Sequence, residues 1–420
     1  MVADGGLGII PALPRRQDGS FRTLRMLRTL VERSIGVREL SWADVLARRL
    51  RGHALIDPAS PPLLEEVVGR VGGIHAQVIS AAEISIGVRV AGLTRRAIRR
   101  AVVDERRLVK TYGPRGTVHL LPAGDLPMFM GALHALSHEW VRAEETRIGL
   151  NASRLAELVA AIGDSLRGDM LTREELGARV VERLGSWAQV PAIPSFGGLA
   201  PRWQAGLGYS AYAGQLCFGP NRGNRATFVH PADWVGGKPP GDSFDCVTEV
   251  LRRYLLAYGP AIPDAFAQWI GISRTQAAAV FAERPLFVEA VQVEGWTGWM
   301  WQDAGQDASQ APESVRLLPY FDVYGIGGFP RERVFGPMGT TRALSRGAAG
   351  PVPIVVVNGE VAGVWEYARG GGQVRVTVDL FEPPSSSLSA LVKAEGLRLA
   401  AVLEEPVDLQ FGPVAVRAHL

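Results

Sequence analysis

One order of elements recurs along this chain and constrains its fold more than any other feature. Helical segments are followed by two short apolar segments, which a turn rich in glycine and proline joins. In the first case, predicted helices over residues 81–90 and 94–104 precede apolar segments at 109–112 and 117–121. The turn between these segments is Gly-Pro-Arg-Gly, which favours a hairpin. Helices followed by a two-stranded hairpin make up a winged helix, and we predict one here.

The same order occurs twice more, without sequence identity strong enough to define a repeat. The second unit has predicted helices over residues 155–166 and 172–184, where Thr172 begins a capping box. Its hairpin has a basic turn over residues 219–225. The third unit continues with predicted helices and then strands over residues 247–257, 262–269, 273–281, 286–293 and 296–301.

The pattern changes to β structure from about residue 316. Strands predicted at 354–358 and 360–365 meet at an Asn-Gly pair, which is a strong hairpin signal. A further strand at 373–378 and a helix over 387–403 follow. We interpret this region as a small β-barrel or half-barrel with one covering helix.

The chain is therefore predicted to be α+β, with three tandem winged helices before a carboxy-terminal β-barrel. The predicted divisions are a flexible basic extension at 1–37, winged helices at 38–125, 126–240 and 241–312, and the barrel domain at 313–420.

Composition excludes several classes of protein. The 420 residues are 47% hydrophobic and 21% charged, which is ordinary for a globular chain with several cores. The two cysteines match no zinc or redox spacing, which argues for a reducing cytoplasm and against a disulfide scaffold. No apolar run approaches the length of a membrane span. We expect a cytoplasmic monomer without a membrane partner.

Basic residues are concentrated near the amino terminus. Residues 1–120 contain 20 Lys and Arg against 11 Asp and Glu, although the whole chain has a formal net charge of only +3. Such a segment can face nucleic-acid phosphates, since Lys and Arg contacts dominate affinity for nucleic acids. The alternative is that Arg-rich helices, such as the one containing residues 95–100, are solvated faces.

A short apolar segment before the first hairpin contains His75 and Gln77, with Ala76 between them. Both side chains can position a water molecule, and a neutral histidine can also accept its proton. In an extended segment the two side chains point the same way, whereas in a helix they lie roughly 200° apart. A joint role therefore requires residues 75–77 to be non-helical.

These residues and the hairpin at 114–122 together resemble the signature region of the AlkZ-like DNA glycosylases, which remove alkylated bases from DNA. The resemblance extends over about residues 38–415 and includes, in order, segments at 207–209, 228–234, 258–261, 317–324 and 363–365. It implies three tandem winged helices and a β-barrel that surround a concave DNA-binding surface.

The resemblance also implies site residues. His75 and Gln77 match the His-apolar-Gln variant of the family's catalytic motif. Arg115, Arg222 and Arg225 lie in the hairpin turns and are candidate phosphate contacts, although such arginines are often only solubilising. His119, in the first hairpin, is a candidate DNA contact or a structural residue.

The expected activity is that of a monofunctional DNA glycosylase that acts on N7-alkylated purines in double-stranded DNA, either in base excision repair or in self-resistance to alkylating natural products. We expect no metal or nucleotide cofactor, since no phosphate-binding glycine loop or convincing ligand cluster is present. The alternative is a winged-helix DNA-binding protein without catalysis, which would not depend on His75 or Gln77.

Other candidate residues have simpler explanations. His134 and His138 have the spacing of metal ligands on a helix, but no third ligand follows, so we expect no metal there. The tryptophans of the segment 296–301 form either a base-stacking platform or, as we prefer, part of the core. For Asp322 we favour a structural role.

Overall fold

The computed structural model describes residues 37–415 except for residues 138–139, 141–146, 196–197, 237–240, 303, 305–311 and 346. The predicted extension at 1–37 and the candidate His138 therefore lie outside the described residues, apart from residue 37 itself. Within the described ranges, helices and strands alternate, which confirms the α+β class. None of the helices in those ranges is long and apolar enough to cross a membrane.

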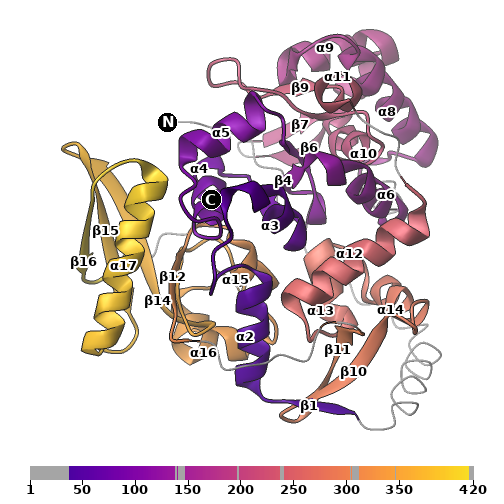
Figure 1. Cartoon of the computed structure of the whole chain (residues 1–420). Coiled ribbons are helices and arrows are strands. Elements are labelled where there is room, and N and C mark those ends of the chain that lie inside the picture. Colours follow the sequence, from indigo (N-terminus) through magenta and orange to yellow (C-terminus); the bar gives the residue numbers. More distant parts are fainter. Residues whose placement is uncertain are drawn as a thin grey trace.

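The first unit combines three helices with a three-stranded sheet in the order β2-β4-β3, and it occupies the centre of the molecule in Figure 1. Its hairpin matches the prediction, with both strands ending within one residue of the expected positions. The elements are α3 (Leu64–Arg70), β2 (Ile74–His75), α4 (Ile79–Gly87), α5 (Arg95–Val103), β3 (Leu108–Tyr112) and β4 (Val118–Pro122).

The second unit lies above the first in Figure 1 and contains the sheet β5-β9-β8. The Thr172 side chain accepts a hydrogen bond from the Glu175 N–H, and the Glu175 carboxylate accepts one from the Thr172 N–H. The predicted capping box is therefore present. The elements are α8 (Ala152–Leu166), β5 (Leu171–Thr172), α9 (Arg173–Leu184), β6 (Pro191–Ser195), β7 (Gly198–Pro201), α10 (Gly206–Tyr212), β8 (Cys217–Phe218), β9 (Thr227–Val229) and α11 (Pro231–Val235).

The third unit contains a strand from the start of the described chain. β1 (Arg38–Leu40) pairs in parallel with β10, which gives the sheet β1-β10-β11. Residues 38–40 thus lie in the third sheet, although the predicted division assigns them to the first unit. The other elements of this unit are α12 (Ser243–Tyr258), α13 (Pro263–Ile270), α14 (Arg274–Ala282), β10 (Val288–Val293) and β11 (Trp296–Trp301).

The carboxy-terminal part contains an open five-stranded sheet, and no closed barrel is found in the described residues, although a barrel or half-barrel was predicted. The strand order is β12-β13-β14-β15-β16, with β12 and β16 at the edges. The predicted Asn-Gly hairpin is confirmed between β13 and β14. The last strand runs parallel to β15 after a helical crossover, which extends the sheet instead of closing it. The strands are β12 (Val315–Leu318), β13 (Ile354–Val357), β14 (Glu360–Gly370), β15 (Gln373–Leu380) and β16 (Val407–Phe411), and the helices are α15 (Val323–Gly327), α16 (Arg331–Arg342) and α17 (Ser386–Leu403).

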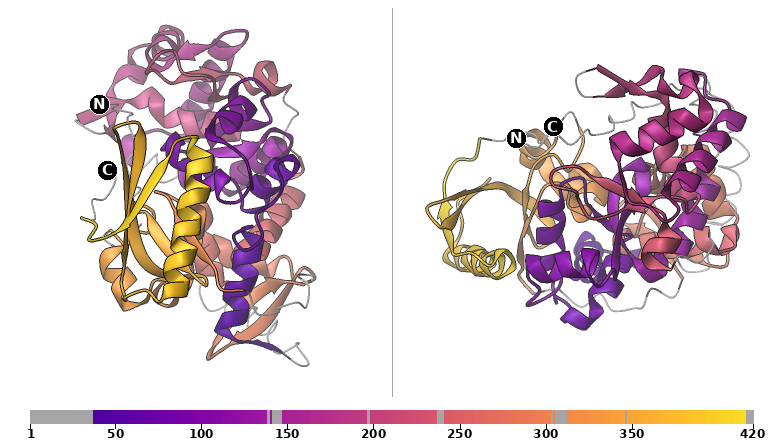
Figure 2. Two further views of the ribbon diagram at one scale, coloured as in Figure 1. Left: turned by 60° about the vertical axis from the view of Figure 1, so that its left-hand side comes forward. Right: turned by 90° about the horizontal axis from the view of Figure 1, so that it is seen from above.

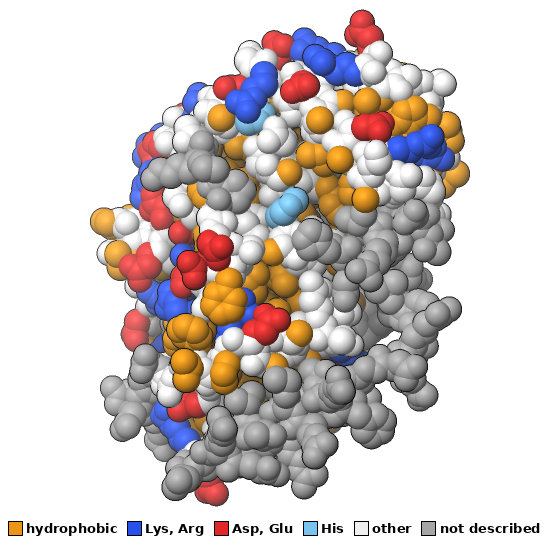
Figure 3. All heavy atoms as spheres, turned by 90° about the vertical axis from the view of Figure 1, so that its right-hand side faces the viewer, with side chains coloured by type: hydrophobic (Ala, Val, Ile, Leu, Met, Phe, Trp, Pro, Cys, Tyr) orange, Lys and Arg blue, Asp and Glu red, His pale blue; other side chains and the backbone are white. Residues whose placement is uncertain are grey.

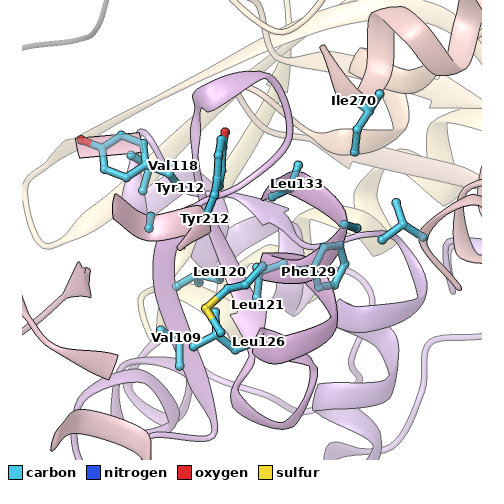
Figure 4. Packing of buried hydrophobic residues seen from close by; sticks show 14 of the residues in the cluster. Val109, Tyr112, Val118, Leu120, Leu121, Leu126, Phe129, Leu133, Tyr212 and Ile270 are labelled. Atoms are coloured by element: carbon cyan, nitrogen blue, oxygen red, sulfur yellow. The ribbon is translucent and has the colours of Figure 1, made fainter. Parts of the chain in front are cut away.

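Two hydrophobic cores hold these parts together. The larger core runs through all three units, and Figure 4 shows side chains of β3, β4 and α6 (Leu126–Leu136) converging with Tyr212 and Ile270. The second core joins the carboxy-terminal sheet to α2 (Trp42–Gly52) and to the third sheet.

Helix α4 takes part in both cores. Its Ala82 and Ile86 belong to the larger core, whereas Ile84 belongs to the core shared with the carboxy-terminal part. The two views of Figure 2 likewise show the carboxy-terminal sheet on one side of the first unit. Packing on two sides fixes α4, and with it the segment that leads into the helix at residue 79.

Candidate active site

The short strand β2 places His75 directly opposite His119. β2 pairs antiparallel with β4, and the Cα partners are Ile74 with Leu120 and His75 with His119. Gln77 lies in a bend just before α4. The segment 75–77 is therefore non-helical, as a joint role of His75 and Gln77 requires.

Two aromatic rings enclose the imidazole of His75, which is only 6% exposed. The Phe321 ring stacks on it with centroids 4.9 Å apart and planes at 24°. The His119 ring packs against it in a T-shaped arrangement, with ring centroids 5.2 Å apart. Burial, together with the nearby His119 and Arg115, lowers the pKa of His75 well below its usual value of 6.5. The ring is therefore neutral at physiological pH.

The Nδ1 atom of His75 is buried and makes no hydrogen bond within the described residues. Gln77 is half-buried, and its side-chain amide likewise has no hydrogen-bond partner there. An amide without a protein partner keeps its carbonyl oxygen available as an acceptor. The site thus contains a neutral imidazole and an amide that make no hydrogen bonds with other described residues.

His119 is a buried residue and lies against His75 instead of on the surface. Its Nδ1 atom lies 2.9 Å from the carbonyl oxygen of Thr117, a distance that suits donation from Nδ1–H. Burial, and then the charge of Arg115, lowers the pKa of His119 to about 3. His119 therefore lies beside the candidate catalytic residue His75. A direct contact between His119 and DNA stays a prediction.

Arg115 lies in a turn that is packed against the third unit. Its φ is 59°, and its guanidinium donates to the carbonyl oxygen of Trp269 at 2.6 Å. Across the contact, a Cβ atom added to Gly271 would lie 2.8 Å from the Cα atom of Arg115. Burial lowers the pKa of Arg115 to about 10. The guanidinium is thus engaged inside the protein, which does not favour the predicted phosphate contact.

The two arginines of the second hairpin are exposed. Arg222 donates to the Glu175 carboxylate at 2.8 and 3.0 Å and to the Met170 carbonyl oxygen at 2.8 Å. Arg225 makes no side-chain hydrogen bond or ion pair within the described ranges. Of the three candidate arginines, Arg225 is the one whose charge is available to a phosphate.

The arginine-rich helix α5 is largely neutralised by acidic neighbours. Arg95 and Arg99 both pair with the buried Glu83, at 3.1 and 2.6 Å. Arg100 pairs with Glu105 at 3.3 Å. On the face in Figure 3 as well, basic and acidic side chains lie close to one another along the upper and left-hand edges. Local charge counts therefore do not mark a DNA-facing surface by themselves.

Sequence reasoning missed Phe321 as a site residue. It lies 246 positions from His75 in the chain, and only its place in the segment 317–324 of the resemblance pointed to it. The neighbouring Asp322 has the structural role that we favoured. It caps α15 by accepting from the Tyr324 backbone and forms a fully buried ion pair with Arg89. Removal of one partner of such a pair costs about 3–5 kcal/mol.

The remaining candidates are structural where the structure describes them. Trp299 and Trp301 are buried and pack on Phe281 and Phe287, which confirms core packing over base stacking for these two. Trp296 meets the Phe329 ring. Among the described residues, no group of three or more His, Cys, Asp or Glu side chains is arranged to hold a metal.

A cavity of about 960 Å³ lies away from these residues, between α2, α3 and α12. Several arginines line it, and some of them pair with acids that also line it, as in the contacts of Arg107 with Glu65 and of Arg253 with Asp125. Neither His75 nor Gln77 is among its lining residues. The candidate chemistry therefore lies on a short strand and bend and not in this cavity.

Comparisons with known proteins agree with this arrangement. A family model described as DNA glycosylase AlkZ-like matches residues 68–402. An interstrand DNA cross-link repair glycosylase from Streptomyces sahachiroi is 33% identical over 335 residues, which cover 78% of this chain and 88% of that protein. The solved structure of the Streptomyces sahachiroi DNA glycosylase AlkZ has a TM-score of 0.71 at 29% identity, and the match covers 89% of this chain and 100% of that one. The range of the family match includes His75, Gln77 and Phe321.

Proposed function

Because this chain belongs to the AlkZ-like family and is a DNA glycosylase, we propose that it hydrolyses the N-glycosidic bond of N7-alkylated purines with His75 and Gln77. The observation that supports this most is the placement of both residues on one non-helical segment, with neutral side chains that internal hydrogen bonds do not occupy. Family membership also argues against the alternative of a DNA-binding protein without catalysis.

The proposed substrate suits a site without a strong acid. Alkylation at N7 gives the purine a positive charge, so the base is already a good leaving group. The enzyme then has to stabilise an oxocarbenium-like sugar and deliver a water molecule to the anomeric carbon. Both tasks require oriented dipoles or a weak base, and neither requires proton donation to the base.

The two side chains divide these tasks. The amide oxygen of Gln77 accepts a hydrogen bond from the attacking water and presents its negative end to the developing positive charge. His75 is held neutral by burial, and its ring can therefore take up the proton of that water as a general base. Hydrolysis in this way gives a free base and an abasic site.

We take the three helix-and-sheet units to be winged helices that bind duplex DNA as a monomer in the cytoplasm. The exposed turn of the second hairpin, with Arg225, would contact backbone phosphates. The relative from Streptomyces sahachiroi is named for interstrand cross-link repair. For this chain we accordingly include bulky N7 adducts, as well as simple methyl groups, among the proposed lesions.

The test is release of free base from two duplex oligonucleotides, one with a single N7-methylguanine and the other with a bulky N7 adduct. We expect wild type to release base from at least one duplex in a single turnover. Gln77→Ala should lower that rate by about 100-fold or more, because it removes the positioned acceptor. Duplex affinity should stay within about threefold of the wild-type value, since neutral groups contribute little to phosphate binding.

The matched control is Gln410→Ala, which removes an exposed glutamine from β16 in the carboxy-terminal sheet. This variant should release base at the wild-type rate. A Gln77→Ala protein as fast as wild type would exclude the proposed role of Gln77. Wild type that binds both duplexes and releases neither base would exclude N7-alkylpurines as the substrate.

A further inference from the structure

We propose that Phe321 is a positioning residue for His75, and that Asp322 and Arg89 anchor it. The proposal rests on the proposed function, because it assumes that His75 acts in base release. Its starting observation is the parallel stack of the two rings, with centroids 4.9 Å apart and planes at 24°. Phe321 comes from the carboxy-terminal part, so a second region of the chain completes the site.

His75 needs such a neighbour because no hydrogen bond from the described residues fixes its ring. A functional histidine is commonly oriented by a hydrogen bond at the nitrogen that does not react. The Nδ1 atom of His75 is buried and has no such partner within the described residues. By contrast, His230 accepts from Ala232 at Nδ1 and lies 3.1 Å from Gln215 Oε1 at Nε2. The orientation of the His75 ring therefore depends on packing against Phe321 and His119.

The backbone holds Phe321 in an unusual conformation. Its φ of 58° is in the left-handed region, which non-glycine residues rarely adopt. Its N–H donates to the carbonyl oxygen of Gly350 at 2.8 Å. A Cβ atom on Gly350 would lie 3.1 Å from the Phe321 ring, so this close approach requires a small residue there. Such strained residues persist where the surrounding structure fixes them, and they cluster at functional sites.

Asp322 ties Phe321 to the helix that follows the catalytic segment. Its carboxylate accepts from Arg89 at 2.7 and 2.8 Å and from Ser85 Oγ at 2.7 Å. Both donors lie at or just beyond the carboxyl end of α4, whose first residue is two positions after Gln77. The adjacent residues Phe321 and Asp322 thus contact the segment on either side of Gln77. This arrangement holds the ring of His75 and the helix after Gln77 in fixed positions relative to each other.

The test compares Phe321→Leu, which removes the ring, with Phe321→Tyr, which keeps it. Phe321→Leu should lower the single-turnover rate of base release by about 10- to 100-fold, since small misplacements of a catalytic group are costly. Its duplex affinity should stay within about twofold of wild type. Phe321→Tyr should restore the rate to within about threefold. The control is Phe287→Leu, which breaks a similar stack on Trp301 away from His75 and should leave the rate unchanged.

A double variant separates positioning from a general loss of structure. In the His75→Ala background, Phe321→Leu should cause no further loss of rate, because the ring acts only through His75. A further loss of tenfold or more there would show that Phe321 acts on the DNA or on the fold, and would overturn the proposal. Equal rates of wild type and Phe321→Leu would overturn it as well.

A second measurement does not need activity. In NMR spectra of protein with ¹³C-labelled histidine, the ring current of Phe321 should change the chemical shifts of the His75 ring protons. This change in chemical shift should vanish in Phe321→Leu and persist in Phe321→Tyr, while the chemical shifts of His230 should be the same in all three proteins. If base release fails in wild type but these shifts appear, the proposed function is wrong and the packing is right. If the His75 signals are the same in wild type and Phe321→Leu, the ring does not position His75.

Discussion

The hairpins of the first and second units have similar sequences but lie in different surroundings. Each joins two short strands through a turn that contains Gly-Pro and arginine. In the first hairpin, the Gly113 carbonyl oxygen accepts from Tyr212 of the second unit at 3.0 Å, and Arg115 donates to Trp269 of the third unit. In the second hairpin, residues 221–225 are all exposed.

The difference shows that one sequence signature can serve two purposes. The first turn is where all three units meet, and its strand β4 carries His119 against His75. Among the described residues, the second turn makes side-chain hydrogen bonds only within its own unit, as Arg222 does, and it leaves Arg225 exposed. We propose that the first hairpin supports the candidate site while the second is free to contact DNA.

The largest effect is expected from an added methyl group in the first hairpin. In Gly113→Ala, the new Cβ would lie 2.7 Å from Nδ1 of His119 and 2.8 Å from its Cγ, so this ring, which packs against His75, has to shift. We expect the free energy of unfolding to fall by about 1–3 kcal/mol. Base release should slow by about 10- to 100-fold, because the His75 ring is displaced. Urea denaturation and single-turnover kinetics measure the two effects.

The matched change in the second hairpin is Gly223→Ala. The new Cβ meets no atom within 4 Å, but the φ of +64° is strained for alanine. Stability should therefore fall by about 1 kcal/mol, and base release should stay within about twofold of wild type. Similar losses of rate in both variants would show that the two hairpins do not differ in the way proposed.

A smaller effect is expected from removing one arginine from each turn. Arg225→Ala should change stability by less than about 0.5 kcal/mol and reduce the slope of log affinity against log salt by about 1. Arg115→Ala should instead lower the free energy of unfolding by about 2 kcal/mol, because a charged hydrogen bond between two units is lost. Denaturation and duplex binding at several salt concentrations measure both quantities. A reduced salt slope for Arg115→Ala alone would reverse the assignment of the two turns.

Local sequence signals predicted the individual elements well. Side-chain periodicity and turn residues gave both hairpins and the Asn-Gly turn at Asn358, and the capping box at Thr172 is present. His75 and Gln77 became candidate catalytic residues because their motif resembles that of a known family. These signals lie within a few residues of one another, so the sequence alone reveals them.

Contacts between distant segments were not predictable in the same way. The strand β1 pairs with β10 more than 250 residues later, and β16 extends the sheet in parallel instead of closing a barrel. Likewise, no residue near Arg115 in the sequence indicates that its guanidinium donates to the Trp269 carbonyl oxygen. No residue near Phe321 indicates that its ring stacks on His75. Such contacts depend on how whole units pack, which neither periodicity nor propensity encodes.

Lowering the pH should destabilise the first hairpin through His119. Folding lowers its pKa from 6.5 to about 3, because the ring is buried near Arg115. Only the unfolded state binds a proton between these values. Stability is therefore complete above pH 6.5 and falls as the pH decreases from 6.5 towards 3. At pH 5 the loss from this one residue is about 2 kcal/mol.

Denaturation of wild type and His119→Asn at pH 7.5 and pH 5 isolates this contribution, because all other titrating groups are shared. The variant should lose about 2 kcal/mol less than wild type between the two pH values. Base release by wild type should meanwhile be level from pH 7.5 to pH 6, since the lowered pKa of His75 keeps that ring neutral too. A rate that falls with a midpoint near pH 6.5 would mean that His75 titrates as a solvated histidine. In that case the first hairpin would not bury the site, and its contrast with the second hairpin would be lost.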